Sequence, residues 1–284
     1  MNKLIWLLLL ICWQASATPD FSLIQQQAEL ASLAYAESAT IEKQLAKRNL
    51  PLVRHSAIAE TEVSYFLTII NDVQVISVRG TANQKNVMVD LDLQLIPSNS
   101  LGIQLHRGFA NAASSIFKDI KPSLNKQQAI STTGHSLGGS VALILAMHLQ
   151  KQGYLLNSVM TFGQPKVTNI AGAAKFNALP LIRVVTQDDI VPLVPPLSPL
   201  QLKNLDIYWH SGEEIILMKG NEFARTEGLK SMMRATKILS AVPDERNLNA
   251  HKMTTYLALI KGKLKGAEQV PYKTGISLFG LSLD

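Results

Sequence analysis

The sequence of 284 residues contains a single cysteine, Cys12. A disulfide needs two thiols, and this one lies in a segment that we expect to be removed, so the sequence predicts neither a disulfide nor a thiol nucleophile. The six histidines are scattered, without a His-Glu-x-x-His motif or cysteine ligands beside them. We therefore expect no metal site and no cofactor.

Long apolar runs are also scarce. One covers residues 4–13, after a single positive charge, and is followed by a small-x-small pattern that ends at Ala17. This arrangement is typical of a secretory signal peptide, so we predict that residues 1–17 are removed and that the protein is secreted or periplasmic. Lipidation of Cys12 is the alternative, although Leu10-Ile11 stand where a small residue is usual.

No stretch reaches the ~20 apolar residues of a membrane span, so we expect a soluble protein without a transmembrane segment. The formal net charge of +6 is spread along the chain, which suggests anionic surfaces as partners. No nucleic-acid motif accompanies it, and we expect no nucleic-acid partner. Without repeats or low-complexity segments, residues 18–284 are predicted to form a single domain, whose oligomeric state the sequence does not indicate.

The feature around which the chain is organised lies between residues 129 and 149. Residues 129–133 are β-rich, residues 141–149 are apolar at helical spacing, and Gly-His-Ser-Leu-Gly stands between them. This G-x-S-x-G pattern is a nucleophile elbow, which presents the hydroxyl of Ser136 at a strained strand-to-helix turn. The Leu137 N–H, at the positive end of the helix dipole, would meet an oxyanion on the attacked carbonyl.

Predicted strands and helices alternate along the chain. Strands are expected at residues 62–71, 73–79, 129–133, 158–163, 181–186, 206–210 and 213–218, and helices at 21–47, 108–123, 141–149, 169–177, 229–239 and 249–263. Asn71-Asp72 between the first two strands is a hairpin signal. The alternation predicts an α/β protein whose mostly parallel central sheet has helices on both faces.

In such sheets the chemistry lies at the carboxyl ends of the strands. Carboxylates follow a predicted strand there, at Asp188 and Asp189, and histidines come later, at His210 and His251. With Ser136 they give the chain order Ser, Asp, His that is expected of an α/β-hydrolase.

Five motifs follow one another along the chain: Arg79-Gly80-Thr81, Leu105-His106-Arg107-Gly108-Phe109, Gly134-His135-Ser136-Leu137-Gly138-Gly139, Thr161-Phe162-Gly163-Gln164-Pro165-Lys166-Val167 and Asp189-Ile190-Val191-Pro192. In order and spacing they resemble the class 3 lipase family, the fungal-type triacylglycerol lipases. The resemblance covers residues 73–210 well, and the N-terminal helix and the His251 region loosely.

The resemblance implies roles for particular residues. Ser136 corresponds to the nucleophile, His251 to the base and Asp189, which directly precedes Ile-Val-Pro, to the acid that holds the base. Thr81 corresponds to a second oxyanion-hole donor beside Leu137.

Other residues compete for these roles. Asp188 is the alternative acid, and His210, which also follows the acid in the chain, is the alternative base. His135 and His106 are expected to be packed structural residues.

A lid is predicted within residues 83–96, where apolar and polar residues mix. The family's Asn-Trp-x-x-Asp-Leu segment covers the serine in water, and it corresponds here to a run that lacks the tryptophan. The residues of this run that we assign to the lid are Asn86, Val87, Met88, Asp90 and Leu91. An ordinary surface helix packed on the core is the alternative.

The resemblance implies a secreted carboxylic ester hydrolase that cleaves triacylglycerol or related acyl esters at an oil–water or membrane interface. A phospholipase A1 or a short-chain esterase could use the same site. A catalytically silent hydrolase fold that only binds lipid is the alternative that is not an enzyme. The predicted helix at residues 229–239 could dock the protein on anionic lipid through its cations Lys230, Arg234 and Lys237. Alternatively, this helix could pack on the sheet and leave its cations in water.

Overall fold

The structure, a computed structural model, describes residues 18–80, 94–196, 201, 206–234 and 244–273, and the backbone of the short strands β14 (Ser277–Leu278) and β15 (Leu281–Ser282). The predicted signal peptide lies outside the described residues. So do Thr81 and the lid residues Asn86, Val87, Met88, Asp90 and Leu91.

The described part of the chain is built on a nine-stranded sheet in the order β1-β2-β3-β6-β7-β9-β11-β12-β13. Its bounds are β1 (Leu52–Ile58), β2 (Val63–Ile70), β3 (Val73–Val78), β6 (Ile130–His135), β7 (Leu156–Phe162), β9 (Leu181–Thr186), β11 (Glu213–Leu217), β12 (Glu222–Thr226) and β13 (Glu268–Gln269). Strands β3, β6, β7, β9 and β11 run parallel, and β1 and β2 pair antiparallel with their neighbours. Strand β12 pairs antiparallel with β11 and parallel with β13. The predicted mostly parallel sheet is thus confirmed.

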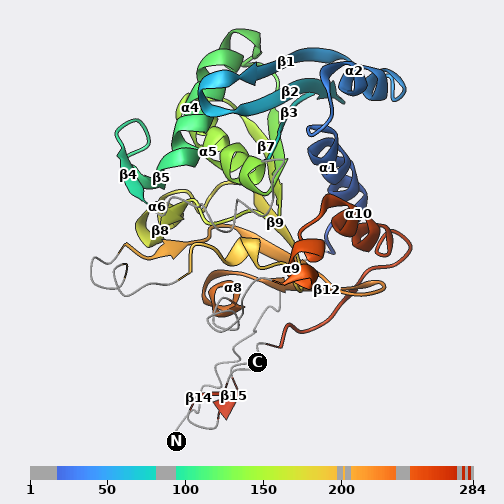
Figure 1. Ribbon diagram of the computed structural model, residues 1–284, viewed down its shortest axis with the longest axis vertical. Helices are drawn as coiled ribbons and strands as arrows, with labels where there is room; N and C mark the ends of the chain where they lie inside the picture. Colours follow the sequence, from blue (N-terminus) through green and yellow to red (C-terminus); the bar gives the residue numbers. More distant parts are fainter. Residues whose placement is uncertain are drawn as a thin grey trace, which may run out of the picture.

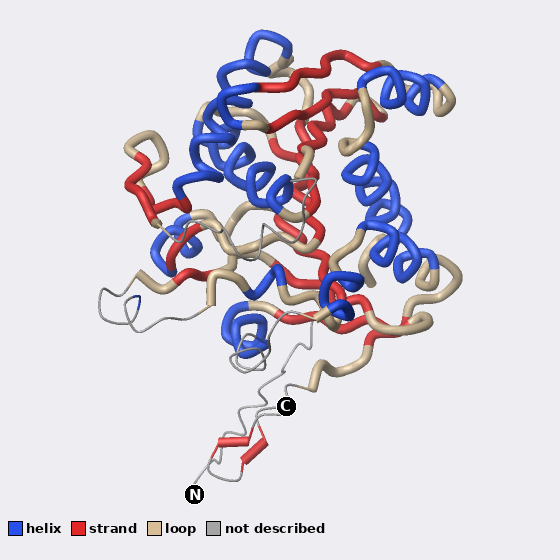
Figure 2. The backbone as a smooth tube through the Cα atoms, viewed as in Figure 1, coloured by secondary structure: helices blue, strands red, loops and turns tan. Residues whose placement is uncertain are grey.

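Helices cover both faces of this sheet, as predicted (Figure 1). On one face lie α1 (Phe21–Leu33), α2 (Ser38–Ala46) and α10 (Met253–Lys261), and on the other α4 (Arg107–Ile120) and α5 (Leu137–Lys151). Figure 2 shows these helices flanking the strands, with the sheet seen nearly edge-on between them. Each face is closed by its own cluster of buried apolar side chains, which supply the main favourable term in folding.

The remaining described elements lie around the edge of this core. A second, four-stranded sheet has the order β10-β8-β5-β4. Its strands are β4 (Leu95–Ser98), β5 (Ile103–His106), β8 (Thr168–Asn169) and β10 (Tyr208–Trp209), and the short helices are α6 (Ile170–Lys175), α8 (Gly228–Met233), α9 (Glu245–Ala250), η1 (Ala59–Thr61), η2 (Lys121–Ser123) and η3 (Val191–Leu193).

Three predicted elements differ from those observed. The helix expected over residues 21–47 is interrupted between α1 and α2, where Tyr35 and Ala36 close a turn by donating to the carbonyls of residues 32 and 33. The strand expected at 206–210 is only the two residues of β10, in the second sheet. Helix 249–263 is divided into α9 and α10, and His251 occupies the junction.

Several observed strands were not predicted, among them β1 and β12 of the nine-stranded sheet. β1 is an edge strand whose side chains are mostly half-exposed, so its sequence lacks the alternation that marks a strand with one buried face. β12 is a hairpin partner of β11. By contrast, the hairpin at Asn71-Asp72 is confirmed, since both residues have positive φ, of 49° and 62°, as a tight primed turn requires.

The late helix differs most in its polarity. Arg234, predicted to face water or lipid, is 3% exposed, whereas the apolar Leu229 is 66% exposed. The Arg234 guanidinium donates to the Glu214 carboxylate at 2.7 Å and to the Thr186 carbonyl at 3.2 Å. Arg234 therefore faces neither lipid nor water, so both expectations for it were wrong; it forms an ion pair with the buried Glu214 of β11 instead. Lys237 lies outside the described residues.

Candidate active site

The nucleophile elbow connects β6 to α5. Ser136 has φ 58° and ψ −132°, a sparsely populated conformation for a residue with a side chain. It is held there by its backbone N–H, which donates to the Phe162 carbonyl at 2.8 Å, and by the first turn of α5, which bonds back to its carbonyl. The strained serine is therefore fixed by the strand beside it and the helix after it.

Close backbone packing around the elbow depends on glycine. A Cβ at Gly134 would collide with the Gly138 carbonyl, and one at Gly138 would lie 2.7 Å from the Gly80 nitrogen. Since real Cβ atoms do not approach so closely, β6, α5 and the end of β3 can meet only because these side chains are absent.

Three side chains from separate parts of the chain meet at the carboxyl ends of the strands. His251 lies with its Nε2 2.9 Å from Ser136 Oγ and its Nδ1 2.8 Å from Asp189 Oδ2. All three residues are at most 1% exposed. With Nδ1–H donating to the carboxylate, Nε2 is free to accept the serine proton, which is the arrangement of a nucleophile, its base and an orienting acid.

The carboxylate of Asp189 is the acceptor of several donors. Tyr256 Oη donates to Oδ2 at 2.5 Å, and the Val191 N–H donates to Oδ1 at 2.9 Å. Burial opposes the charged form, but the His251 imidazole and these hydrogen bonds together hold the pKa of Asp189 below its ordinary value. Asp189 is thus kept as an anion inside the protein.

Two residues of this site were missed by sequence reasoning. Burial and the neighbouring Asp189 raise the pKa of Tyr256 well above its ordinary value, so its hydroxyl remains a donor to the carboxylate. Gly163 has φ +58°, and a Cβ there would lie 2.8 Å from Asp189 Oδ2 and 2.9 Å from His251 Nδ1. Its place in the Thr-Phe-Gly-Gln-Pro motif was the available signal.

Gly163→Ala should therefore lower kcat for ester hydrolysis by roughly 10- to 100-fold, because the added methyl displaces the acid and the base from each other. Gly153→Ala is the matched control. Gly153 also has a positive φ, +77°, but nothing lies within 4 Å of its Cβ position. The Gly153→Ala variant should lose thermal stability because of backbone strain but keep its kcat. Equal kcat values for the two variants would contradict the role of Gly163 in leaving room for Asp189 and His251.

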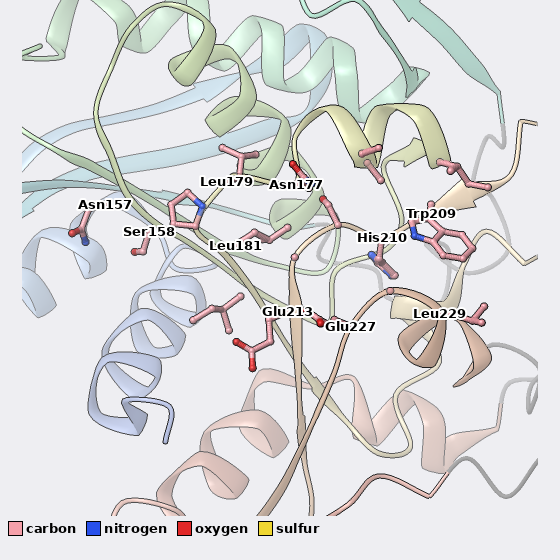
Figure 3. Close-up of a pocket in the computed structure, with 18 of the residues that line it drawn as sticks. Asn157, Ser158, Asn177, Leu179, Leu181, Trp209, His210, Glu213, Glu227 and Leu229 are labelled. Carbon is pink, nitrogen blue, oxygen red and sulfur yellow. The ribbon is translucent and has the colours of Figure 1, made fainter. Parts of the chain in front are cut away.

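The competing acid and base lie elsewhere. Asp188 forms a surface ion pair with Arg246 at 2.9 Å. His210 donates from Nε2 to the Pro192 carbonyl at 2.6 Å and lines a groove of about 1020 Å³ with Leu181 and Trp209 (Figure 3). That groove lies at the amino ends of β7, β9 and β11, the opposite end of the sheet from Ser136.

His135 and His106 have the packed roles expected of them. His135 is fully buried, and burial together with the nearby His251 lowers its pKa to about 3, so it is neutral. His106 caps α4 by accepting the Phe109 N–H at 3.4 Å, and its ring stacks on that of Phe109.

The oxyanion hole is described only in part. Leu137 is the first residue of α5, where helix N–H groups have no intrahelical acceptor and the helix dipole is positive. Thr81 lies outside the described residues, but Gly80 before it packs against the elbow. Among the described residues, no group of His, Cys, Asp and Glu could hold a metal ion, and no helix is long and apolar enough to cross a membrane.

Comparison with known sequences gives one family. Residues 75–198 match the family described as "Lipase (class 3)". The chain is 31% identical over 147 residues to "Secreted mono- and diacylglycerol lipase 1" of Fusarium solani, covering 49% of this chain and 44% of that protein. It is 27% identical over 180 residues to "Phospholipase A1-II 1" of Oryza sativa subsp. indica, covering 51% and 43%. The aligned part thus spans less than half the length of these relatives.

Solved structures share the fold. A lipase from Rhizopus microsporus var. chinensis aligns with a TM-score of 0.60 and 24% identity over 71% of this chain and 76% of that one. The LIP2 lipase of Yarrowia lipolytica aligns with a TM-score of 0.60 and 22% identity over 73% and 85%. The fold is therefore that of an α/β-hydrolase, and residues 75–198 of this chain are similar to the class 3 lipase family.

Proposed function

We propose that this protein is a secreted serine carboxylic ester hydrolase, a lipase that cleaves triacylglycerol or related acyl esters through an acyl-enzyme intermediate. The observation that carries the proposal is the continuous hydrogen-bonded series from Ser136 Oγ through His251 to Asp189, at 2.9 and 2.8 Å. Such a series also argues against a silent lipid-binding fold, since binding lipid requires no base beside the serine.

In the proposed reaction, Ser136 Oγ attacks the ester carbonyl while His251 Nε2 takes its proton. The charge of Asp189 stabilises the imidazolium that forms. The oxygen of the tetrahedral intermediate accepts from the Leu137 N–H and from Thr81, the proposed second donor. His251 then gives the proton to the leaving alcohol, the acyl group stays on Ser136, and water repeats the sequence to release the fatty acid.

The surroundings of the elbow suit an acyl substrate. A groove of about 590 Å³ runs beside Leu137, and the apolar Ile58 and Val63 are among the residues that line it. A groove of this kind next to the nucleophile could hold an acyl chain. Gly80 also lines this groove, and the proposed lid, residues 86–91, follows it in the sequence.

Export is part of the proposal. Its support is the predicted signal peptide over residues 1–17 and the relative from Fusarium solani, which is named as a secreted lipase.

The function is tested by combining labelling with a substrate panel. A fluorophosphonate should label the protein, and peptide mass spectrometry should locate the label on Ser136. Release of fatty acid should then be measured from p-nitrophenyl esters of graded chain length, emulsified tri- and diacylglycerol, and phospholipid vesicles. Hydrolysis of the glycerides is expected, a preference for the vesicles would instead assign a phospholipase A1, and turnover of short esters alone a short-chain esterase. Absence of both label and hydrolysis would reject the enzyme.

A further inference from the structure

A single tyrosine hydroxyl lies between the two backbone segments that flank the proposed oxyanion hole. Tyr35 is in the turn between α1 and α2, and its Oη is 2.8 Å from His135 Nδ1, on the residue before the nucleophile. Gly80, the residue before Thr81 in the sequence, packs directly against the same oxygen. One hydroxyl therefore joins the end of β3 to the end of β6.

The directions of these hydrogen bonds are fixed by a carbonyl. His135 Nε2 lies 2.7 Å from the His251 carbonyl oxygen, which can only accept, so Nε2 carries the proton. In a neutral imidazole Nδ1 must then accept, and Tyr35 must donate to it. The chain of donors runs from Tyr35 through His135 to the backbone of His251.

The space around the hydroxyl is filled. A Cβ at Gly80 would collide with Tyr35 Oη and would lie 2.6 Å from the His135 carbonyl. The rings of His135 and His251 are in contact, with centroids 4.5 Å apart. Removal of the hydroxyl would therefore leave the buried Nδ1 of His135 without its donor, at a place where Gly80 and His135 pack closely.

We propose that Tyr35 is a positioning residue for ester hydrolysis: its hydroxyl fixes the backbone at Gly80 relative to Ser136–Leu137, and through His135 it anchors the backbone of His251. This inference rests on the proposed function. Tyr35 contacts none of the reacting atoms, so its effect is on the alignment of the two oxyanion-hole donors.

Tyr35→Phe tests the proposal, because phenylalanine keeps the ring and loses only the hydroxyl. The kcat for a dissolved short-chain ester should fall about tenfold or more, while KM stays within about twofold, since oxyanion donors act on the transition state rather than on the bound ester. Affinity for an alkylboronic acid, which forms a tetrahedral adduct on Ser136, should fall by a similar factor. A loss of stability alone would leave both quantities unchanged per active site.

Tyr65→Phe is the matched control. Tyr65 is 1% exposed, donates to Asp119 Oδ2 at 2.6 Å and accepts from Arg54 Nε at 2.9 Å, so this change also removes one buried hydroxyl and its hydrogen bonds. Tyr65 belongs to the cluster on the opposite face of the sheet, away from His135. Thermal unfolding should register both changes, whereas kcat and boronate affinity should fall only for Tyr35→Phe.

The tautomer of His135 can be measured directly on the wild-type protein. In ¹⁵N NMR, His135 should show the Nε2–H tautomer with an unprotonated, hydrogen-bonded Nδ1. A proton on Nδ1, or a folded Tyr35→Phe with wild-type kcat and boronate affinity, would overturn the role of Tyr35. A wild type that neither hydrolyses esters nor binds boronate would instead reject the proposed function.

Discussion

Ser136→Ala and His251→Ala are each expected to lower kcat for ester hydrolysis by about four to six orders of magnitude. The hydroxyl and the imidazole act as one unit, because Oγ is a poor nucleophile until Nε2, 2.9 Å away, takes its proton. The double variant should consequently be little worse than either single variant. The residual rate would come from the oxyanion hole and substrate binding alone.

The kcat values are measured in the steady state on a p-nitrophenyl ester, after any initial burst of product. The enzyme must first be freed of contaminating esterases, so that a kcat lowered by about four to six orders of magnitude can still be measured. His210→Ala is the comparison, because this buried histidine bonds to the Pro192 carbonyl and not to Ser136. It should keep most of its kcat, with any loss appearing in thermal stability. A His210→Ala variant as inactive as Ser136→Ala, beside an active His251→Ala, would move the base to His210.

The nucleophile was predictable from the sequence because its structure is local. Strand, turn and helix fall within residues 129–149, and the spacing of the glycines indicates where the backbones of the strand and the helix pass close to each other. From the residue pattern alone the acid and the base were predictable only in chain order, since Asp188 and Asp189 are adjacent in the sequence. The resemblance to class 3 lipases is what favoured Asp189 and His251. Their separation depends on the turn after β9, which directs Asp189 to His251 and leaves Asp188 beside Arg246 on the surface.

Residues that act through long-range hydrogen bonds left no such signal. Tyr35 is 100 positions from His135, and Tyr256 is 67 positions from Asp189. Neither pair forms a pattern within a strand or a helix. Arg234 shows the reverse error: helical periodicity treated it as solvated, although Glu214 lies 20 positions earlier on a buried strand.

The second large effect concerns stability and that same carboxylate. Glu214 is fully buried, with Arg183 3.2 Å and Arg234 2.7 Å from its Oε1, while Thr226 donates to Oε2 at 2.6 Å. Glu214→Gln should lower the free energy of unfolding by about 3–5 kcal/mol, because two buried guanidinium groups would remain without a counter-ion. Denaturant unfolding at pH 7 measures the change.

The adjacent residue provides the control. Glu213 also pairs with an arginine, Arg225, but its side chain is 30% exposed. Water screens this pair, so Glu213→Gln should cost no more than about 1 kcal/mol. Similar losses for the two neighbouring glutamates would contradict the idea that burial makes the Glu214 cluster critical.

The pH dependence separates lost charge from lost packing. Burial opposes ionisation of Glu214, yet Arg234 and Arg183 hold its pKa below the ordinary value of 4.5. The unfolded chain therefore binds this proton first as the pH falls, so the stability that the carboxylate contributes is present above about pH 4.5 and is lost progressively below it. Other titrating groups are common to wild type and variant and cancel in the difference. The stability gap between wild type and Glu214→Gln should accordingly be widest near neutral pH and should narrow below pH 4.5. A gap that stayed constant into acid would show that the glutamine disturbs packing, not charge.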